Sequence, residues 1–128
     1  PVGDGSIFRI WFSPNAEAKV RLFFVRPGSP DPTPLDVAVF TIMDIDCGSR
    51  RPYYDECETV EVGTDGLLQY IVGNAVIQTH NTATDRFTFT DNHMSGGENN
   101  PTSIVLTEEQ KKLSVTLVFE NLEEVQLR

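Results

Sequence analysis

Hydrophobic and polar residues alternate along most of this chain, and valine, isoleucine, phenylalanine and threonine dominate the alternating segments. This period of two is typical of β-strands that bury one face and expose the other. We expect about nine strands, at residues 7–12, 20–24, 37–46, 59–62, 67–72, 75–80, 86–90, 113–120 and 124–127. So many short strands in 128 residues predict an all-β fold, an antiparallel β-sandwich, with jelly-roll and immunoglobulin-like strand orders both open.

Two segments predict other local structure. Residues 27–34 hold four of the eight prolines and predict a surface connection, because proline cannot donate a sheet hydrogen bond. Thr107 and Gln110 have capping-box spacing, which predicts a short helix over residues 107–112. The length fits a single domain, 1–128, and its abrupt ends lead us to expect a piece excised or processed from a larger extracellular protein.

The charge of the chain excludes some partners. Nineteen acidic residues against ten basic ones give a net charge of -9, which repels nucleic acid and anionic membrane surfaces. No apolar run approaches the roughly 20 residues of a membrane helix. We therefore expect neither nucleic-acid binding nor membrane insertion.

The two cysteines, Cys47 and Cys57, are ten positions apart. A disulfide between them would close a short loop and stabilise the fold by roughly 2.5 to 3 kcal/mol. The bridge implies an oxidising compartment, so we expect a secreted or cell-surface protein. A reduced cytosolic pair is the alternative, but neither Cys-x-x-Cys spacing nor a histidine in metal-ligand register supports it.

Acidic residues gather around these cysteines. Seven of the nineteen are Asp44, Asp46, Asp55, Glu56, Glu58, Glu61 and Asp65. In the strand expected at 37–46, the core-facing row is Ala38, Phe40 and Ile42. If the alternation continues, Asp44 and Asp46 lie on the same side as this row. In the strand expected at 59–62, Val60 and Val62 face the core, so Glu58, two residues before Val60, faces the same side.

Carboxylates that converge in this way need positive charge. Two like charges about 4 Å apart repel by about 4 kcal/mol at an effective dielectric constant near 20. Ca²⁺ suits such a site because it binds six to eight oxygens in flexible geometry. We expect a calcium site formed by Asp44, Asp46, Glu58 and Asp55. Pairing with Arg50 or Arg51, or simple solvation of the acids, are the alternatives.

Two loops carry further candidate ligand-binding residues. The loop between the cysteines contains Arg50, Arg51, Tyr53 and Tyr54, and the polar loop at 91–103 contains Asn92, His93, Glu98 and Asn99. Aromatic faces beside guanidinium groups suit sugar rings or a protein partner, and binding residues concentrate on loops. The structural alternatives are a tyrosine that covers the disulfide and a polar connection without a ligand.

One part of the acidic region has a familiar pattern. Val39-Phe40-Thr41-Ile42-Met43-Asp44-Ile45-Asp46, followed by Glu58-Thr59-Val60-Glu61-Val62, resembles the F-T-I-x-D-I-D … D/E-x-V-x-V segment of calcium-binding β-sandwich domains in extracellular adhesins and surface proteins. The resemblance covers about a fifth of the chain. It implies a calcium site near Asp44, Asp46 and Glu58, although the loop between the cysteines departs from the pattern.

These observations predict a non-catalytic extracellular module that binds calcium and recognises a glycan or a neighbouring protein. A second hypothesis is a structural subunit of an extracellular filament or sheath, self-assembled through strand or surface contacts. A third is a small glycoside hydrolase, since such enzymes also use paired carboxylates.

Overall fold

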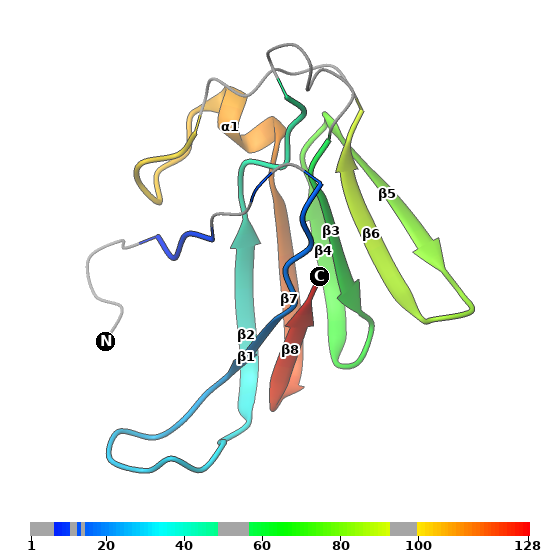
Figure 1. Cartoon of the computed structure of the whole chain (residues 1–128). Coiled ribbons are helices and arrows are strands. Elements are labelled where there is room, and N and C mark those ends of the chain that lie inside the picture. The colour runs from blue at the N-terminus through cyan, green and yellow to red at the C-terminus, as the bar shows by residue number, and fades with distance from the viewer. Residues whose placement is uncertain (1–6, 11–12, 14, 49–56, 93–99) are drawn as a thin grey trace.

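The fold consists of two antiparallel sheets packed face to face (Figure 1). The structure is a computed structural model that describes residues 7–10, 13, 15–48, 57–92 and 100–128. Within these residues the chain forms eight strands and one short helix. The predicted all-β sandwich is therefore confirmed.

The sheets differ in size. The larger has the order β1 (Val20–Phe23), β8 (Glu124–Leu127), β3 (Thr59–Gly63), β6 (Arg86–Asp91) and β5 (Val76–Asn81). The smaller has the order β2 (Leu35–Ile42), β7 (Val115–Leu122) and β4 (Leu67–Val72). The helix α1 (Glu108–Lys112) lies at one end of the sandwich, together with the segments that leave β2 and β6 (Figure 1).

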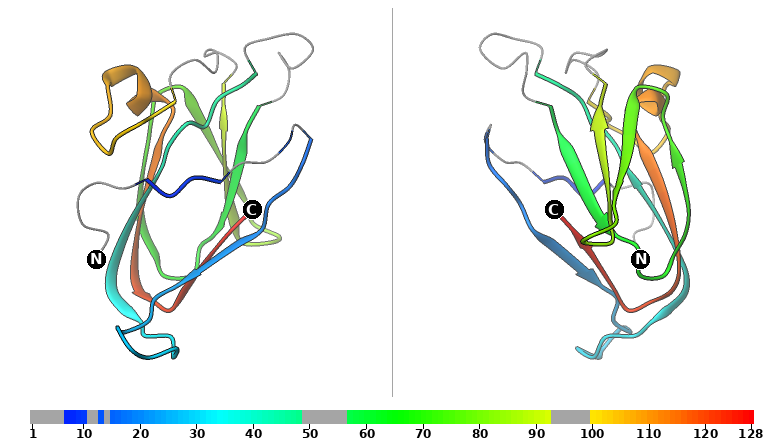
Figure 2. Two further views of the ribbon diagram at one scale, coloured as in Figure 1. Left: turned by 60° about the vertical axis from the view of Figure 1, so that its left-hand side comes forward. Right: turned by 90° about the vertical axis from the view of Figure 1, so that its right-hand side faces the viewer.

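The core lies between the sheets, and β7 is central to it. Leu113, Val115, Leu117 and Phe119 are all buried, as the alternation predicts. Phe89 and Val62 of the larger sheet are fully buried against them, and Figure 2 shows the two layers from the side. Each fully buried large apolar side chain contributes about 1.5–3 kcal/mol, so the packing between the sheets is the main source of stability.

The chain passes from the smaller to the larger sheet between β4 and β5. At this corner the Gly73 amide donates to the Ser114 carbonyl at 2.8 Å, and the Ala75 amide donates to the Lys112 carbonyl at 3.1 Å. The corner thus satisfies a carbonyl at the end of α1 that has no partner within the helix. At the other end of α1, Thr107 and Gln110 form the predicted capping box.

The prediction of a strand at 7–12 is wrong for the part that the structure describes. Residues 7–10 belong to neither sheet, and residues 11 and 12 lie outside the described residues. The Phe8 residue is 77% exposed, and the Arg9 guanidinium donates to the Pro101 carbonyl at 2.9 Å. Alternation shows that a segment is suited to a sheet, but a strand also needs a neighbouring edge with which to pair.

The strand expected at 37–46 ends early. Ala38, Phe40 and Ile42 face the core as predicted, but β2 stops at Ile42. Asp44 then has a φ of 71°, in the left-handed region, which interrupts the pleat. Ile45 follows it into the core at 1% exposure, and its amide donates to the Leu113 carbonyl at 3.0 Å. The side-chain alternation used to place Asp44 and Asp46 is therefore wrong beyond Ile42.

Candidate cation site at the acidic end of the sandwich

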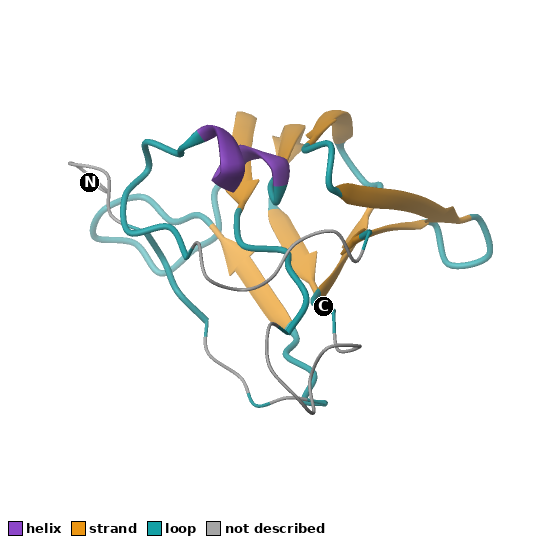
Figure 3. Cartoon of the chain, turned by 90° about the horizontal axis from the view of Figure 1, so that it is seen from above, coloured by secondary structure: helices purple, strands orange, loops and turns teal. Residues whose placement is uncertain are grey.

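The segment after β2 is tied to the start of β3 by covalent and hydrogen bonds. Cys47 and Cys57 form the predicted disulfide and also pair as an antiparallel bridge. Next to it, the Glu58 amide donates to the Asp46 carbonyl at 2.8 Å. Asp46 and Glu58 are thus held beside each other between the end of β2 and the start of β3. Figure 3 shows the sandwich from the end at which α1 lies.

The carboxyl groups at this end affect one another. Partial burial, together with repulsion by Asp44 and Asp91, raises the pKa of Asp46 to about 6. Partial burial, together with repulsion by Asp46 and Asp44, raises the pKa of Glu58 to about 7. Because the Glu58 residue as a whole is exposed, water screens its interactions, and its shift overstates its effect on stability. The three acids predicted to converge are therefore electrostatically coupled.

Among the described residues of this cluster, Asp44 is the acid whose pKa is affected by a positive charge. Burial raises its pKa, and the Arg9 guanidinium partly opposes that rise. Among the described residues, no lysine or arginine lies within ion-pair distance of Asp44, Asp46 or Glu58. Arg50 and Arg51, the predicted alternative partners, lie outside the described residues, as does Asp55, the fourth predicted ligand.

Asp91 is a further acid at this end, beyond the predicted set of Asp44, Asp46, Glu58 and Asp55. It is the last residue of β6, pairs with Val76 of β5 and is 1% exposed. Its charge contributes to the raised pKa of Asp46. The side-chain alternation of this strand indicates the position of Asp91. Phe87 and Phe89 face inward, and the next residue on the same face is Asp91.

Asn100 brings an amide to Asp44. One terminal atom of its side chain lies 3.1 Å and 3.3 Å from the two carboxylate oxygens of Asp44. With nitrogen in that position the amide donates to the carboxylate, whereas with oxygen there both residues offer oxygens to one point. The first arrangement satisfies both groups and stabilises the ionised Asp44 by hydrogen bonds, whereas the second would need a cation between the oxygens.

The described side chains do not by themselves form a finished metal site. Among them, no three Asp, Glu, His or Cys side chains are grouped closely enough to hold an ion. A cation at this end would require the carboxylates to reorient or oxygens from the rest of the chain to join them. Ca²⁺ tolerates such assembly because its coordination geometry is flexible.

The predicted ligand-binding loops fall mostly outside the described residues. This applies to Arg50, Arg51, Tyr53, Tyr54, His93, Glu98 and Asn99. Asn92 is described: it is half-buried, and its amide donates to the Ala75 carbonyl at 2.9 Å. Its backbone therefore fixes the start of the polar loop against the corner between β4 and β5, and a ligand role for these residues stays a prediction.

Comparisons of the chain with protein-family models, characterised proteins and solved structures found no match. The similarity of residues 39–62 to adhesin domains therefore stays a resemblance. In the described part of the chain, no helix has the length and apolar character needed to cross a bilayer. The disulfide is compatible with a secreted protein.

Proposed function

We propose that this chain is a non-catalytic extracellular recognition or adhesion module whose acidic end binds Ca²⁺. The proposal depends on one observation: Asp44, Asp46 and Glu58 have raised pKa values and no lysine or arginine partner among the described residues. Such carboxylates are destabilised when ionised. A divalent cation that relieves this repulsion therefore binds them with a more favourable free energy than it binds solvated acids. The resemblance of this segment to calcium-binding adhesin domains supports the same conclusion.

The disulfide supports the proposal because it restricts the positions of two acids that would bind the ion. Cys47 directly follows Asp46 and Cys57 directly precedes Glu58, so the bridge limits the separation of these two acids. A ligand pair that is restrained before binding loses less conformational entropy when the ion arrives. In this interpretation the disulfide and the ion stabilise the same end of the sandwich.

Calcium is expected to stabilise the protein measurably. At a free concentration about 100 times its dissociation constant, a ligand that binds only the folded state adds about 2.7 kcal/mol to the free energy of unfolding. Thermal melts in calcium, in magnesium and in a chelator measure this gain, and isothermal titration gives the affinity. Magnesium is the matched control, because it demands a smaller and stricter octahedral site. Identical melts in calcium and chelator would remove the proposal.

The recognition part of the proposal has a separate test. In the sequence, residues 49–56 lie between Asp46 and Glu58 and residues 93–99 follow Asp91, so we expect ligand contact in these segments and a dependence on calcium. A glycan array probed with and without calcium is expected to give signals that disappear in chelator. A blank array in both conditions would leave a protein partner as the ligand of this module.

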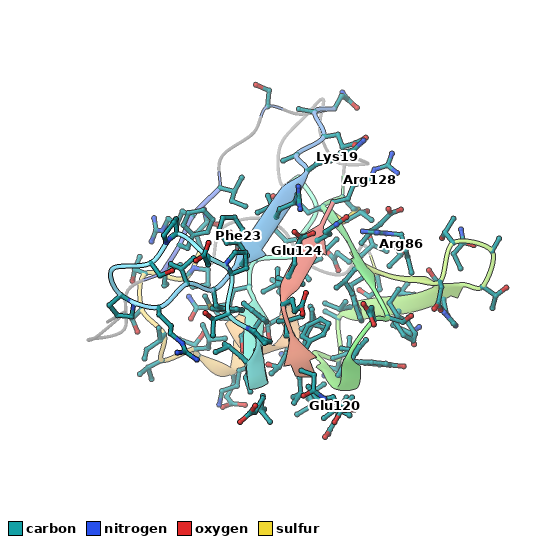
Figure 4. All side chains as sticks on the ribbon, turned by 90° about the horizontal axis from the view of Figure 1, so that it is seen from below. Lys19, Phe23, Arg86, Glu120, Glu124 and Arg128 are labelled. Atoms are coloured by element: carbon teal, nitrogen blue, oxygen red, sulfur yellow. A yellow bond between two sulfur atoms is a disulfide. The ribbon has the colours of Figure 1, made fainter. Side chains whose placement is uncertain are left out.

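A glycoside hydrolase is the alternative from another class, and the raised pKa of Glu58 is what favours it, since a general acid must stay protonated near neutral pH. Two such carboxyl groups must flank a substrate cleft. A groove of about 800 Å³ does exist, but it is lined by Gly63, Arg86, Glu120 and Glu124, at the opposite end of β3 from Glu58 (Figure 4). This separation favours the non-catalytic proposal.

A further inference from the structure

Each sheet of the sandwich ends in two edge strands: β1 and β5 in the larger sheet, β2 and β4 in the smaller. An edge strand presents unpaired amide and carbonyl groups along one side, which a neighbouring chain can use. Proteins protect such edges with short strands, charges, bulges or polar side chains. In this molecule three of the four edges have such protection.

The three protected edges differ in how they are protected. Strand β1 has only four residues, and its Arg21 pairs with Glu124 of β8. Strand β4 contains a register shift between Leu67 and Gln69, which is a bulge that twists the edge. Strand β5 ends in the exposed polar residues Thr79, His80 and Asn81.

Strand β2 is the least protected of the four edges. It has eight residues, which makes it the longest of the four edges, and its only charged residue is Asp36, near its start. Val37 and Val39 on its outer face are 60% and 61% exposed. Within the described residues, β2 pairs with β7 alone, and no other backbone hydrogen bond reaches it. In the left panel of Figure 2 the lower part of β2 lies at the left margin of the ribbon, and the segment at 7–10 crosses the upper part of the strand.

We infer that β2 pairs antiparallel with β2 of a second copy of this chain, so that two three-stranded sheets join into one. Charge favours a second copy at this edge. Most faces of a chain with a net charge of -9 repel another copy, but the outer row of Val37, Val39 and Thr41 is uncharged. Val118 and Thr116, its neighbours across the strand pair at Val39 and Thr41, are uncharged as well, and the one charge beside the row is Glu120, opposite Val37.

In the antiparallel register the Asp36 residues of the two copies, the single charge of each β2 strand, lie far apart. In a register centred on Val39, Asp36 of one copy lies opposite Ile42 of the other. The two Asp36 residues are then six positions apart, about 20 Å along the strand. This separation exceeds the Debye length of about 8 Å at physiological ionic strength, so their repulsion is screened. Val39 meets its own copy, which places two β-branched side chains in contact.

Sedimentation equilibrium from about 1 µM to about 1 mM protein tests this pairing, which does not depend on the calcium proposal. We expect a concentration-dependent dimer. The substitution V39K places two ammonium groups opposite each other and is expected to weaken the dimer at least about tenfold. The matched control is I71K on β4, a residue that is 59% exposed on the same sheet but about 10 Å away, across β7. It is expected to leave the dimer unchanged.

A cysteine variant gives a positive test that does not depend on how V39K folds. In the proposed register the Cβ atoms of residue 39 in the two copies are about 5 Å apart. V39C is therefore expected to form an interchain disulfide under mild oxidation, whereas I71C is not. The inference is overturned by a monomer throughout the concentration range, by equal weakening in V39K and I71K, or by a dimer in which V39C fails to cross-link.

Discussion

Replacing Gly73 by alanine is expected to lower the free energy of unfolding by about 2–4 kcal/mol. Gly73 forms the corner between β4 and β5, where a Cβ atom would collide with the carbonyl oxygens of Lys111 and Lys112 at the end of α1. These oxygens belong to the backbone and cannot swing aside as a flexible side chain would. The corner would therefore have to move away from the helix.

That movement would weaken the hydrogen bonds by which the corner is attached. The Gly73 amide would lose the Ser114 carbonyl, and the Ala75 amide would lose the Lys112 carbonyl. Ala75 also accepts a hydrogen bond from Asn92, so the displacement would reach the acidic end of the sandwich. Urea unfolding curves measure the loss as a lower midpoint at constant slope.

Gly63 in β3 provides the matched control for this substitution. A Cβ atom there meets no heavy atom within 4 Å, and its φ is not in the left-handed region. Alanine at this position is expected to change stability by less than about 1 kcal/mol. If the variant at Gly73 unfolded at the same midpoint as the wild type, the close packing of the corner on α1 would be contradicted.

The sequence predicts this fold best in strands whose alternating apolar side chains are all buried. Val115, Leu117 and Phe119 follow one row because β7 lies between two partners and faces the other sheet, and Leu113, the C-cap of α1 just before the strand, is buried as well. The helix is equally predictable, because the capping box depends only on neighbouring residues. Strand order was open in the sequence, because it depends on contacts between distant segments.

The predicted side-chain directions are wrong where the strand is expected to continue beyond Ile42, the last residue of β2. Asp44 adopts a left-handed backbone, which aspartate tolerates better than most residues, and it reverses the faces of the residues that follow. Asp44, Asp46 and Glu58 still become coupled, but because the Cys47–Cys57 bridge joins their segments rather than because a single row continues. The same row argument, applied to β6, would have added Asp91 to the cluster.

Replacing Asp46 by asparagine is expected to raise the stability of the calcium-free protein by about 1–3 kcal/mol at about pH 7.5. The ionised Asp46 carboxylate is partly buried and repelled by Asp44 and Asp91, which raises its pKa to about 6. A neutral amide of the same shape removes this repulsion. The substitution is also expected to abolish most of the stabilisation by calcium, because it removes a charged ligand.

The pH dependence of the wild type tests the same electrostatics. The pKa of Asp46 rises from 3.8 to about 6 on folding, and that of Glu58 from 4.5 to about 7. As the pH rises, the unfolded chain therefore loses these protons at a lower pH than the folded protein does. In chelator, we expect stability to fall as the pH rises from about 4 to about 7 and then to level off. In D46N this fall is expected to be smaller, as chemical denaturation at each pH would show.

Asp65 supplies the matched control for the Asp46 variant. It is exposed in the turn between β3 and β4, at the far end of β3 from Glu58, and D65N makes the same change in net charge. We expect it to alter stability by less than about 0.5 kcal/mol and to leave the calcium effect intact. A calcium-free D46N that is less stable than the wild type would contradict the repulsion. It would then indicate that Asp46 already has a cationic partner, with Arg50 and Arg51 as the nearest candidates in the sequence.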